Sequence, residues 1–379
     1  MYISGIGISS SLGNGIDDNW KLATQHKSGI SNVSYDEYSD HNDAYLARAK
    51  QIVGEDRLFD MTEVAFLEVL EKSNLEASDL KNTALVFAHG TPDNPFVVNE
   101  GNRLTSSGRT KPKTVYRSMN SYVAARLAQK YELTNLVVSN SYACAGSAQS
   151  IHLGMSLIKS GLVDKCICGG GEAIDYYTYN AFKSMRKVLS QDNVIEPFGK
   201  NRDGIGLGEG TGLVLLESEK SIRERQVKPY AQVVSSYFQN VPSAVFGDMP
   251  SAQPWIDAAS QIVNPEGIDY VLAHATSTPK GDLLEGKAIT ELFPDAQTSS
   301  LKYTLGHSIS ASSALDIIFL AEGYKKETML GIGKEYTLDD ELSELNVLFK
   351  TKATPYKRAV KFSAGFGGGI SCIELASVI

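Results

Sequence analysis

Short, continuous apolar runs alternate with helix-like patterns along most of the chain. These runs are rich in β-branched residues and cover residues 83–88, 135–139, 165–168, 211–217, 270–273, 359–363 and 370–375. Runs of this length without polar alternation are typical of strands in a sheet that is covered on both faces. Because helical patterns separate the runs, we predict an α/β fold with a buried, largely parallel sheet.

One of the helical patterns directly follows a cysteine, Cys144. In the segment 139–173, SNSYACAGSAQSIHLGMSLIKSGLVDKCICGGGEA, apolar residues recur at intervals of three and four: Ala148, Ile151, Met155, Ile158 and Leu162. This spacing predicts a helix with one apolar face that begins just after Cys144. The free N–H groups at a helix start lower a thiol pKa and can hold an oxyanion. A buried, inert thiol explains this segment equally well.

Composition narrows the class of protein. Of the 379 residues, 42% are hydrophobic and 21% are charged, which is ordinary for one large globular domain or two closely packed ones. The net charge of −8 argues against a nucleic-acid surface. No apolar stretch is long enough to span a bilayer and the N-terminus lacks a signal-peptide pattern, so we expect a cytoplasmic protein. The cysteines have no framework spacing, which predicts free thiols: Cys144, Cys166, Cys168 and Cys372.

Two of the six histidines lie where strand-like runs end. His274 follows the run 270–273, and His307 precedes a second small-residue helix pattern. The carboxyl ends of strands are where open α/β sheets bind ligands. Cys144, His274 and His307 lack the close paired spacing of a zinc site, so we expect no metal.

Two imidazoles and a nearby lysine suit thioester chemistry better than proteolysis, which uses one histidine with an orienting Asn or Asp. His274 and His307 can stabilise an enolate, and Lys302 adds positive charge near both and could orient them through a carboxylate such as Glu285. For each residue alone a structural role explains it equally well. Only the joint pattern points to catalysis.

Seven motifs in order then resemble the beta-ketoacyl synthases, the condensing enzymes of fatty-acid and polyketide assembly. The resemblance covers nearly the whole chain, through residues 5–30, 142–146, 169–173, 197–212, 274–279, Lys302 with Gly306-His307, and 365–368. The sequence departs from the family at several positions. Ala275 replaces the usual glycine and Asp316 replaces the usual glutamate. Gly369 replaces a common threonine, and Tyr303 replaces a small residue. These changes leave the Cys-His-His set intact but put the shape of the acyl pocket in doubt.

The resemblance implies a thiolase fold: two similar halves in a layered α-β-α-β-α arrangement with mixed, largely parallel sheets. We expect residues 1–235 to form the half with the nucleophile and residues 236–379 the half with both histidines. A hint of such a repeat is visible in the small residues and helix pattern that follow both Cys144 and His307.

The resemblance also implies roles for individual residues. Cys144 would carry the acyl group, His274 and His307 would stabilise the enolate, and Lys302 would set the electrostatics. The backbone N–H groups of Cys144 and Phe366 would form the oxyanion hole, with Phe366 also gating the acyl pocket. Supporting roles would fall to four further residues: Glu285, Asp316, Thr276 and Thr278.

The implied substrates are acyl and malonyl thioesters on the phosphopantetheine of an acyl carrier protein, with no other cofactor. Carriers are acidic, so we expect a local basic patch at Arg109, Lys111 and Lys113, in a run from 103 to 117 without Asp or Glu. A solvated loop or a dimer surface explains that run equally well. The family also implies a homodimer, or a heterodimer with a sister subunit.

Three other functions fit parts of the pattern. A chain-length-factor subunit typically lacks the cysteine, and a thiolase or starter-unit synthase lacks the second histidine. An acyltransferase that has lost decarboxylation is the hardest to separate from a synthase by sequence, and release of carbon dioxide would discriminate between them. The sequence leaves open whether the pathway is fatty-acid synthesis or a specialised polyketide or polyene.

Overall fold

The computed structural model describes residues 1–33, 44–91, 94–185, 188–242, 249–262 and 266–378. Its strands are β1 (Tyr2–Ser10), β2 (Gly13–Asn14), β3 (Ile30–Val33), β4 (Ala44–Ala47), β5 (Thr83–Ala88), β6 (Val137–Asn140), β7 (Lys165–Glu172), β8 (Leu207–Gly208), β9 (Gly210–Glu217), β10 (Ala231–Asn240), β11 (Tyr270–Leu272), β12 (Gln297–Ser299), β13 (Arg358–Gly365) and β14 (Gly369–Ala376). All seven apolar runs of the sequence are strands, and β7 extends its run by four residues.

Helices connect most of these strands. They are α1 (Ile16–Thr24), α2 (Arg57–Ser73), α3 (Ala77–Leu80), α4 (Asn94–Ser107), α5 (Thr114–Arg117), α6 (Tyr122–Tyr131), α7 (Gly146–Lys159), α8 (Tyr176–Ser184), α9 (Glu219–Arg225), α10 (Gln253–Ala259), α11 (Pro279–Leu292), α12 (Lys302–Leu305) and α13 (Ser312–Lys325). Four single 3₁₀ turns complete the set: η1 (Ala143–Ala145), η2 (Ile309–Ala311), η3 (Asp340–Leu342) and η4 (Phe366–Gly368).

The main sheet is mixed and consists of two five-stranded parts. Its order is β12-β11-β13-β14-β10-β1-β9-β7-β5-β6, with β2 paired to β1. The outer strands of each part pair in parallel, and the pairing through the middle is antiparallel. Among the described residues the two parts of the sheet pair at the start of β1, where Tyr2 and Ile3 pair with β10 and Met1 exchanges hydrogen bonds with Val233. A separate small sheet has the order β3-β4-β8.

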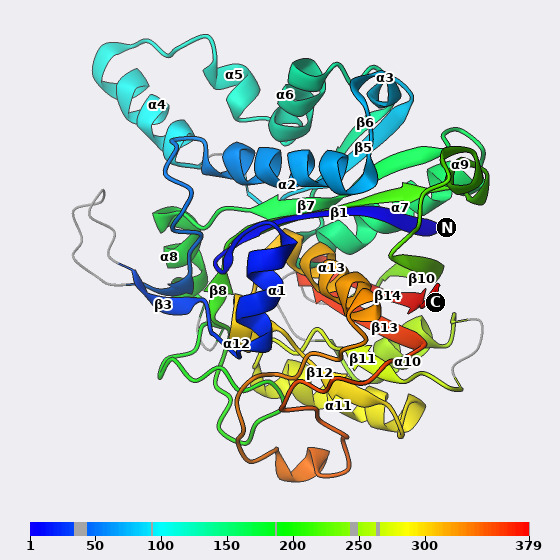
Figure 1. The fold of residues 1–379 in the computed structure, drawn as a ribbon. Helices are drawn as coiled ribbons and strands as arrows, with labels where there is room; N and C mark the ends of the chain where they lie inside the picture. Colours follow the sequence, from blue (N-terminus) through cyan, green and yellow to red (C-terminus); the bar gives the residue numbers. More distant parts are fainter. Residues whose placement is uncertain (34–43, 92–93, 186–187, 243–248, 263–265, 379) are drawn as a thin grey trace.

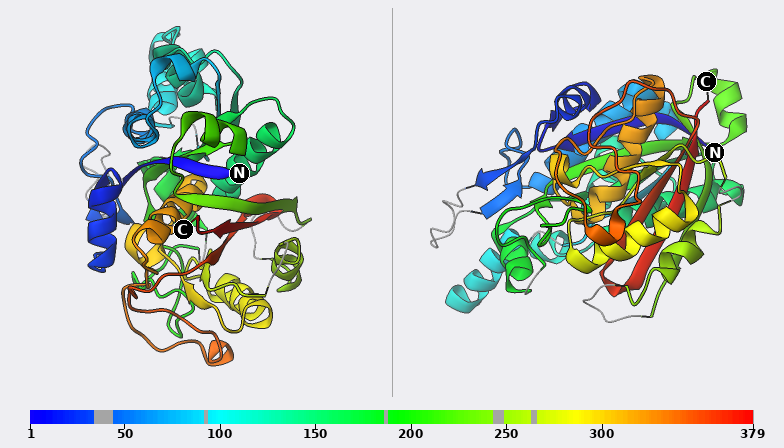
Figure 2. Two further views of the ribbon diagram at one scale, coloured as in Figure 1. Left: turned by 45° about the vertical axis from the view of Figure 1, so that its right-hand side comes forward. Right: turned by 90° about the horizontal axis from the view of Figure 1, so that it is seen from below.

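The elements stack in five layers (Figures 1 and 2). Helices α2 and α6 cover the part of the sheet that contains β5, β7 and β9, and α10 and α11 cover the outer face of β13 and β14. Helices α7 and α13 lie between the two parts of the sheet. The α-β-α-β-α arrangement of a thiolase fold, expected from the sequence, is therefore confirmed.

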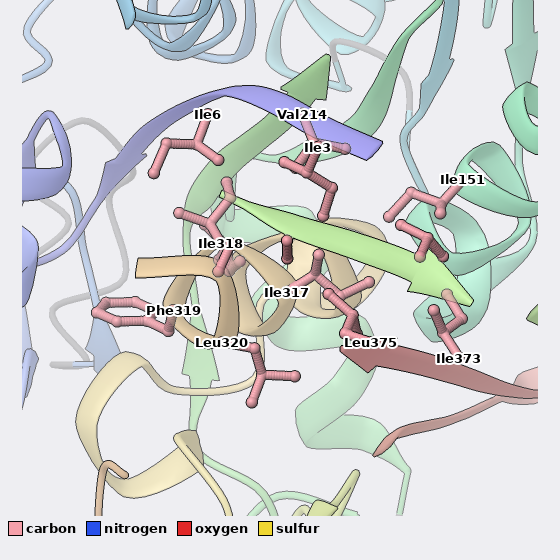
Figure 3. Close-up of a cluster of buried hydrophobic side chains, with 14 of the residues drawn as sticks. Ile3, Ile6, Ile151, Val214, Ile317, Ile318, Phe319, Leu320, Ile373 and Leu375 are labelled. Carbon is pink, nitrogen blue, oxygen red and sulfur yellow. The ribbon is translucent and has the colours of Figure 1, made fainter. Parts of the chain in front are cut away.

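The central layer holds the largest apolar cluster, to which both parts of the sheet contribute (Figure 3). Ile6 and Val214 face it from one part, and Ile373 and Leu375 from the other. Helix α13 is buried over its whole circumference from Ser312 to Tyr324. An apolar stripe on one face would not suffice there, because sheet covers the helix on two sides.

The same local backbone arrangement occurs twice in this layer. In each case a non-glycine residue with positive φ opens a 3₁₀ turn that leads into a 14-residue helix: Ala143 (φ 44°) before α7 and Ile309 (φ 41°) before α13. Cys144 therefore corresponds to Ser310 rather than to His307, which lies three residues earlier. Positive φ is costly for a β-branched residue such as Ile309, and such strain clusters at functional sites.

In the part of the chain that the structure describes, no helix is long and apolar enough to cross a membrane.

Candidate active site

Cys144 lies in the turn η1, immediately before α7, as the sequence predicted. Its turn contacts both η2 and η4, so segments from distant parts of the chain surround the thiol. Two glycines permit this close packing. A Cβ on Gly146 would lie 3.1 Å from the Cβ of Ala88, and a Cβ on Gly365 would lie 3.0 Å from the backbone nitrogen of Cys144. The end of β13 thus approaches the nucleophile at the level of the backbone.

The expectation of a lowered thiol pKa is wrong for the unloaded site. Burial raises the pKa of Cys144 to about 12, and the carboxylate of Glu172 adds to the rise. Hydrogen bonds from the backbone N–H groups of Phe366 and Cys144, and the charge of Lys302, act in the opposite direction. The residues around Cys144 indicate the helix start but not the desolvation of the thiol, which is the larger effect here.

Those two backbone N–H groups are the pair that the resemblance implied for the oxyanion hole. They point at the sulfur from Cys144 itself and from the turn η4, which follows β13. The Phe366 ring packs on Phe182 with centroids 6.2 Å apart. It belongs to an apolar cluster that also contains Cys144, Ile309, Tyr176 and Tyr179. The sulfur therefore has polar donors on one side and apolar walls on the other.

The two predicted histidines lie side by side. His274 follows β11, and His307 lies between α12 and η2. Their ring centroids are 5.3 Å apart and the rings are nearly perpendicular, at 89°. The Nδ1 atoms of both rings are buried and have no hydrogen-bond partner among the described residues.

Both histidines are held in the neutral form. Burial lowers the pKa of His307 to about 3, with the positive charge of Lys302 as the next cause. Burial also lowers the pKa of His274 well below its usual value, and the neighbouring His307 and Lys302 contribute. A neutral imidazole has one N–H donor and one acceptor nitrogen. Two such rings can donate hydrogen bonds to a substrate oxygen.

A buried cluster of charges lies behind the rings. Lys302 Nζ is 3.0 Å from Asp316 Oδ2, as the predicted supporting role of Asp316 requires. A second lysine, Lys361 of β13, contacts the same oxygen at 2.7 Å. Lys361 was not predicted as a site residue, because it lies inside an apolar run that reads as an ordinary core strand. The one available signal was a full charge within that run.

Glu285 has a different partner from the one expected. Its two carboxylate oxygens accept the backbone N–H groups of His274 and Ala275, each at 2.7 Å, rather than a lysine. Burial raises the pKa of this carboxyl, and the two N–H donors oppose the rise. Glu285 therefore fixes the backbone that carries His274, and its influence on Lys302 is at most indirect.

Thr276 and Thr278 lie in the loop between His274 and α11. Their hydroxyl oxygens are 3.4 Å apart. The buried side chain of Arg202 donates to the carbonyls of Thr278 and Pro279, at 3.2 and 2.6 Å, and pairs with Asp339 at 2.7 Å. This arginine, which the sequence analysis did not single out, holds the threonine loop in place.

Glu172 is a further buried carboxylate that the sequence analysis did not single out. It lies at the end of β7 and accepts hydrogen bonds from Ser310 Oγ at 2.6 Å, Thr91 Oγ1 at 2.8 Å and the backbone N–H of Gly90 at 2.9 Å. Burial raises its pKa. Through Ser310 it ties the half with the nucleophile to the turn that follows His307.

The predicted carrier patch lies away from this centre, between α4 and α5, which project beyond the main layers (Figure 1). Arg109 and Lys111 are exposed and Lys113 is partly exposed. A carboxylate from outside the run, Glu100, lies among them and accepts the backbone N–H of Lys111 at 2.7 Å. Arg117 is buried and stacks 4.1 Å from the centroid of Phe96. The basic run is therefore less available, and less positive, than the sequence alone indicates.

No group of three or more His, Cys, Asp or Glu side chains that could hold a metal ion occurs among the described residues. All four cysteines are free thiols. Cys166 and Cys168 are buried on β7 with their sulfurs 3.3 Å apart.

Comparison with known proteins gives consistent matches along the chain. The model of the beta-ketoacyl synthase N-terminal domain matches residues 1–221, and that of the C-terminal domain matches residues 255–330. A putative mitochondrial 3-oxoacyl-[acyl-carrier-protein] synthase of Schizosaccharomyces pombe is 26% identical over 97% of this chain and 96% of that protein. 3-Oxoacyl-[acyl-carrier-protein] synthase 2 of Mycobacterium bovis is also 26% identical, over 97% of this chain and 95% of its own.

Solved structures show the same fold. The ishigamide ketosynthase/chain length factor superimposes with a TM-score of 0.89 at 22% identity, covering 100% of this chain and 99% of that one. A ketosynthase in the AntDE:AntF complex with a type II polyketide acyl-carrier protein gives the same TM-score, identity and coverage.

Proposed function

The chain belongs to the beta-ketoacyl synthase family, and we propose that it is an acyltransferase, a 3-oxoacyl-[acyl carrier protein] synthase, that catalyses decarboxylative Claisen condensation. The observation that carries the proposal is the shared site. The thiol of Cys144 has two backbone donors and lies in η1, which contacts η2. His307 precedes η2 and its ring lies against that of His274, and Lys302 of the buried lysine pair influences the pKa of the thiol and of both rings.

In the first half-reaction Cys144 attacks the thioester of an acyl group on a carrier. The N–H groups of Cys144 and Phe366 hold the oxyanion of the tetrahedral intermediate. The carrier's thiol leaves with the proton that the Cys144 thiol gives up. Because that thiol is protonated at rest, its deprotonation belongs to the acylation step and not to the free enzyme.

In the second half-reaction a malonyl carrier binds. The Nδ1 atoms of His274 and His307 have no acceptor among the described residues, so we place the single proton of each neutral ring on Nε2. Both rings can then donate to the thioester oxygen as carbon dioxide leaves and an enolate forms. The enolate carbon attacks the Cys144 thioester. The thiolate departs and takes a proton from water, and the product is a 3-oxoacyl carrier two carbons longer.

Intact-protein mass after exposure to a panel of acyl carriers tests this proposal most directly. The parent should gain the mass of one acyl group, and malonyl carrier should then release carbon dioxide and yield the 3-oxoacyl product. Cys144→Ala should neither load nor condense and should remain folded. Cys372→Ala, which removes a thiol from β14 outside the site, is the control and should load as the parent does. Loading and condensation by Cys144→Ala would refute the assignment.

We further propose an acyl carrier protein as partner, and a homodimer or a heterodimer with a sister subunit as the assembly. The ishigamide ketosynthase/chain length factor and the AntDE:AntF complex of an acyl-carrier protein with its ketosynthase support this. Arg109, Lys111 and Lys113 would dock the carrier. Charge reversal at Lys111 and Lys113 should weaken carrier binding, whereas reversal at the exposed Lys81 and Lys228 should not.

The remaining parts of the proposal concern place and pathway. We propose residues 1–235 and 236–379 as the two halves, supported by the repeated turn and helix of Cys144 and Ser310. Four free thiols are typical of a reducing compartment, and we propose the cytoplasm. The route is fatty-acid or polyketide assembly, and the acyl group that loads best will separate the two. Loading without release of carbon dioxide would instead favour an acyltransferase that has lost decarboxylation.

A further inference from the structure

Lys361 is a lysine in an unusual place. It lies in the middle of β13, its side chain is 0% exposed, and it is among the largest fully buried side chains of the described residues. Taking an ammonium group out of water costs several kcal/mol unless it is paired and hydrogen-bonded. Its neighbours Val360 and Phe362 pack into the apolar cluster under α10 and α11. The opposite face of the strand, where Lys361 points, packs on α13.

The contacts of Lys361 join the two histidine-bearing segments. Its Nζ donates to the backbone carbonyl of Ala273 at 3.1 Å, and Ala273 directly precedes His274. The same Nζ lies 2.7 Å from Asp316 on α13, the helix that begins just after His307 and η2. One ammonium group therefore connects the end of β11, with the first imidazole, to the helix that follows the second.

Lys361 is not needed to neutralise the charge of Asp316. Asp316 already has a cation, Lys302, 3.0 Å away. While Lys361 is protonated, a second lysine on the same carboxylate oxygen leaves these three side chains with one excess positive charge. Burial lowers the pKa of Lys361 to about 8 and Asp316 opposes the fall, so this charge is present at neutral and acid pH. Glu285, the other buried carboxylate beside them, accepts two backbone N–H groups and has a raised pKa because it is buried. Glu285 therefore offsets the excess positive charge only in part.

We propose that Lys361 is a positioning residue for the decarboxylation half-reaction, which fixes the two imidazoles relative to each other and opposes their protonation with its charge. This inference rests on the proposed synthase activity and goes beyond it, because it assigns a function to a residue outside the Cys-His-His-Lys set. Lys361 touches neither the substrate nor the reacting atoms in this role.

The charged groups around the two imidazole rings agree with the proposal that the charge of Lys361 opposes protonation of the rings. His274 and His307 face each other, and they face Lys302 from α12, Lys361 from β13 and Asp316 from α13, with Glu285 from α11 behind the backbone of His274. After burial, Lys302 and Lys361 both lower the pKa of each imidazole, and Asp316 alone raises that of His307. Loss of the Lys361 charge should therefore raise the pKa of both rings and reduce the neutral fraction in mild acid.

Two substitutions separate the charge of Lys361 from its contact. Lys361→Met removes both and leaves the Lys302–Asp316 pair in place. Lys361→Gln removes the charge but keeps a donor for the Ala273 carbonyl. The matched control is Lys165→Met, which deletes another strand lysine that forms an ion pair. The Nζ of Lys165 lies 2.7 Å from Asp79, and the lysine side chain is 12% exposed. Lys165 starts β7, at the opposite end of that strand from Glu172.

The measurements are acyl loading of Cys144 by intact mass, and carbon dioxide release from malonyl carrier as a function of pH. We expect both Lys361 variants to load within about twofold of the parent and to release carbon dioxide about tenfold or more slowly. The acid limb of decarboxylation should move to higher pH in both. The rate loss should be smaller in Lys361→Gln, which retains the backbone contact. Lys165→Met should match the parent in rate and pH profile.

Three results would overturn the inference. Decarboxylation in both variants with the parent's rate and acid limb would show that the charge has no influence on the imidazoles. Equal losses of loading and decarboxylation, without a pH shift, would indicate a purely structural lysine, and so would failure of both variants to fold. If the parent itself neither loads nor decarboxylates, the proposed synthase activity fails instead, and the two failures remain distinct.

Discussion

The surroundings of Cys144 favour the neutral thiol in the unloaded site. The sulfur is fully desolvated, and the Glu172 carboxylate disfavours a second negative charge nearby. Two backbone donors and Lys302 stabilise the thiolate but do not offset the burial. Such a site keeps a reactive thiolate from forming until a thioester is bound, when the developing charge moves onto the carbonyl oxygen and the same donors hold it.

The raised thiol pKa predicts the pH dependence of alkylation. With a pKa of about 12, only about one molecule in 10⁴ carries the thiolate at pH 8. The rate of modification of Cys144 by iodoacetamide, followed by intact mass, should therefore rise about tenfold per pH unit from pH 7 to pH 9.5 without levelling off. A plateau below pH 9 would show that the helix start and Lys302 outweigh burial.

Gly365 is the residue on which the approach of the second oxyanion donor depends. A Cβ there would lie 3.0 Å from the backbone nitrogens of both Cys144 and Ala145, so Gly365→Ala should displace Phe366 from the nucleophile. We expect acyl loading to slow about 100-fold, the usual cost of losing one oxyanion donor. Gly101→Ala is the control, because nothing lies within 4 Å of a Cβ at that helical position. Loading by Gly365→Ala at the parent's rate would argue against Phe366 as a donor.

At the scale of elements, the residues after strand β6 and at the start of β14 have complementary sizes. Tyr142 packs edge-on against Phe238 with centroids 5.0 Å apart, and its hydroxyl donates to Asn240 at 2.5 Å. A Cβ at Gly369 would lie 2.4 Å from the Tyr142 ring. The tyrosine therefore fills the space that a side chain at Gly369 would need, which explains why this chain lacks the threonine common in the family.

This pairing predicts a rescue. Gly369→Thr alone should lower the free energy of unfolding by about 1–3 kcal/mol, the usual cost of overpacking, because the ring is held by Phe238 and Asn240 and cannot move away freely. Adding Tyr142→Ser should recover most of the loss, as measured by denaturant unfolding of both variants and of Tyr142→Ser alone. Additive losses in the double variant would mean that the two positions do not share one space.

The sequence predicted those elements that are continuous in it. Most of the apolar runs read correctly because burial on both sides leaves an unbroken apolar pattern. The edge strand β6 is only half-buried and reads correctly from its two valines, and the helix after Cys144 reads correctly from apolar residues spaced by three and four. Strand β10 was missed, since Ser235, Ser236 and Gln239 interrupt its apolar residues in a half-buried position. Strand β12 was missed because its three residues, Gln297–Ser299, carry no strand signal.

The candidate site divides in the same way. Cys144, His274 and His307 could be found because each stands in a motif next to a strand end or helix start. Lys361 and Glu285 could not be assigned correctly, because their partners depend on tertiary packing. β13 brings Lys361 to Asp316, and α11 turns Glu285 back onto the backbone of His274. The thiol pKa likewise depends on burial, which the local sequence does not contain.

At the scale of the whole molecule, the two proposed halves share one core. The central cluster combines Ile6 and Val214 from the first half with Ile317 and Leu375 from the second (Figure 3). Separating the halves would expose to water the face of α7 that packs on α13 and β14 and the face of α13 that packs on β9 and α7, at roughly 25 cal/mol for each Å² of apolar surface. The sheet also couples the halves, because strand β10 (Ala231–Asn240) runs across the boundary at residues 235 and 236 and pairs with β14 along its length. The shared apolar layer and this continuous strand together join the halves.

This coupling predicts a single unfolding transition, and the chain has suitable probes. It contains two tryptophans, one in each proposed half. Trp20 stacks on Phe319 of the central helix α13 at 6.2 Å, and Trp255 contacts Phe362 of β13 at 5.6 Å. In Trp20→Phe the remaining Trp255 reports on the second half, and in Trp255→Phe the remaining Trp20 reports on the first half at its contact with α13. For each variant, the tryptophan fluorescence and the far-UV circular dichroism should give the same denaturant midpoint, because neither half keeps its core without the other.

A fluorescence midpoint that departs from the dichroism midpoint in either variant would show that one half unfolds by itself. The central layer would then be an interface between two stable domains, and the residues that Lys361 joins would lie in just one of them.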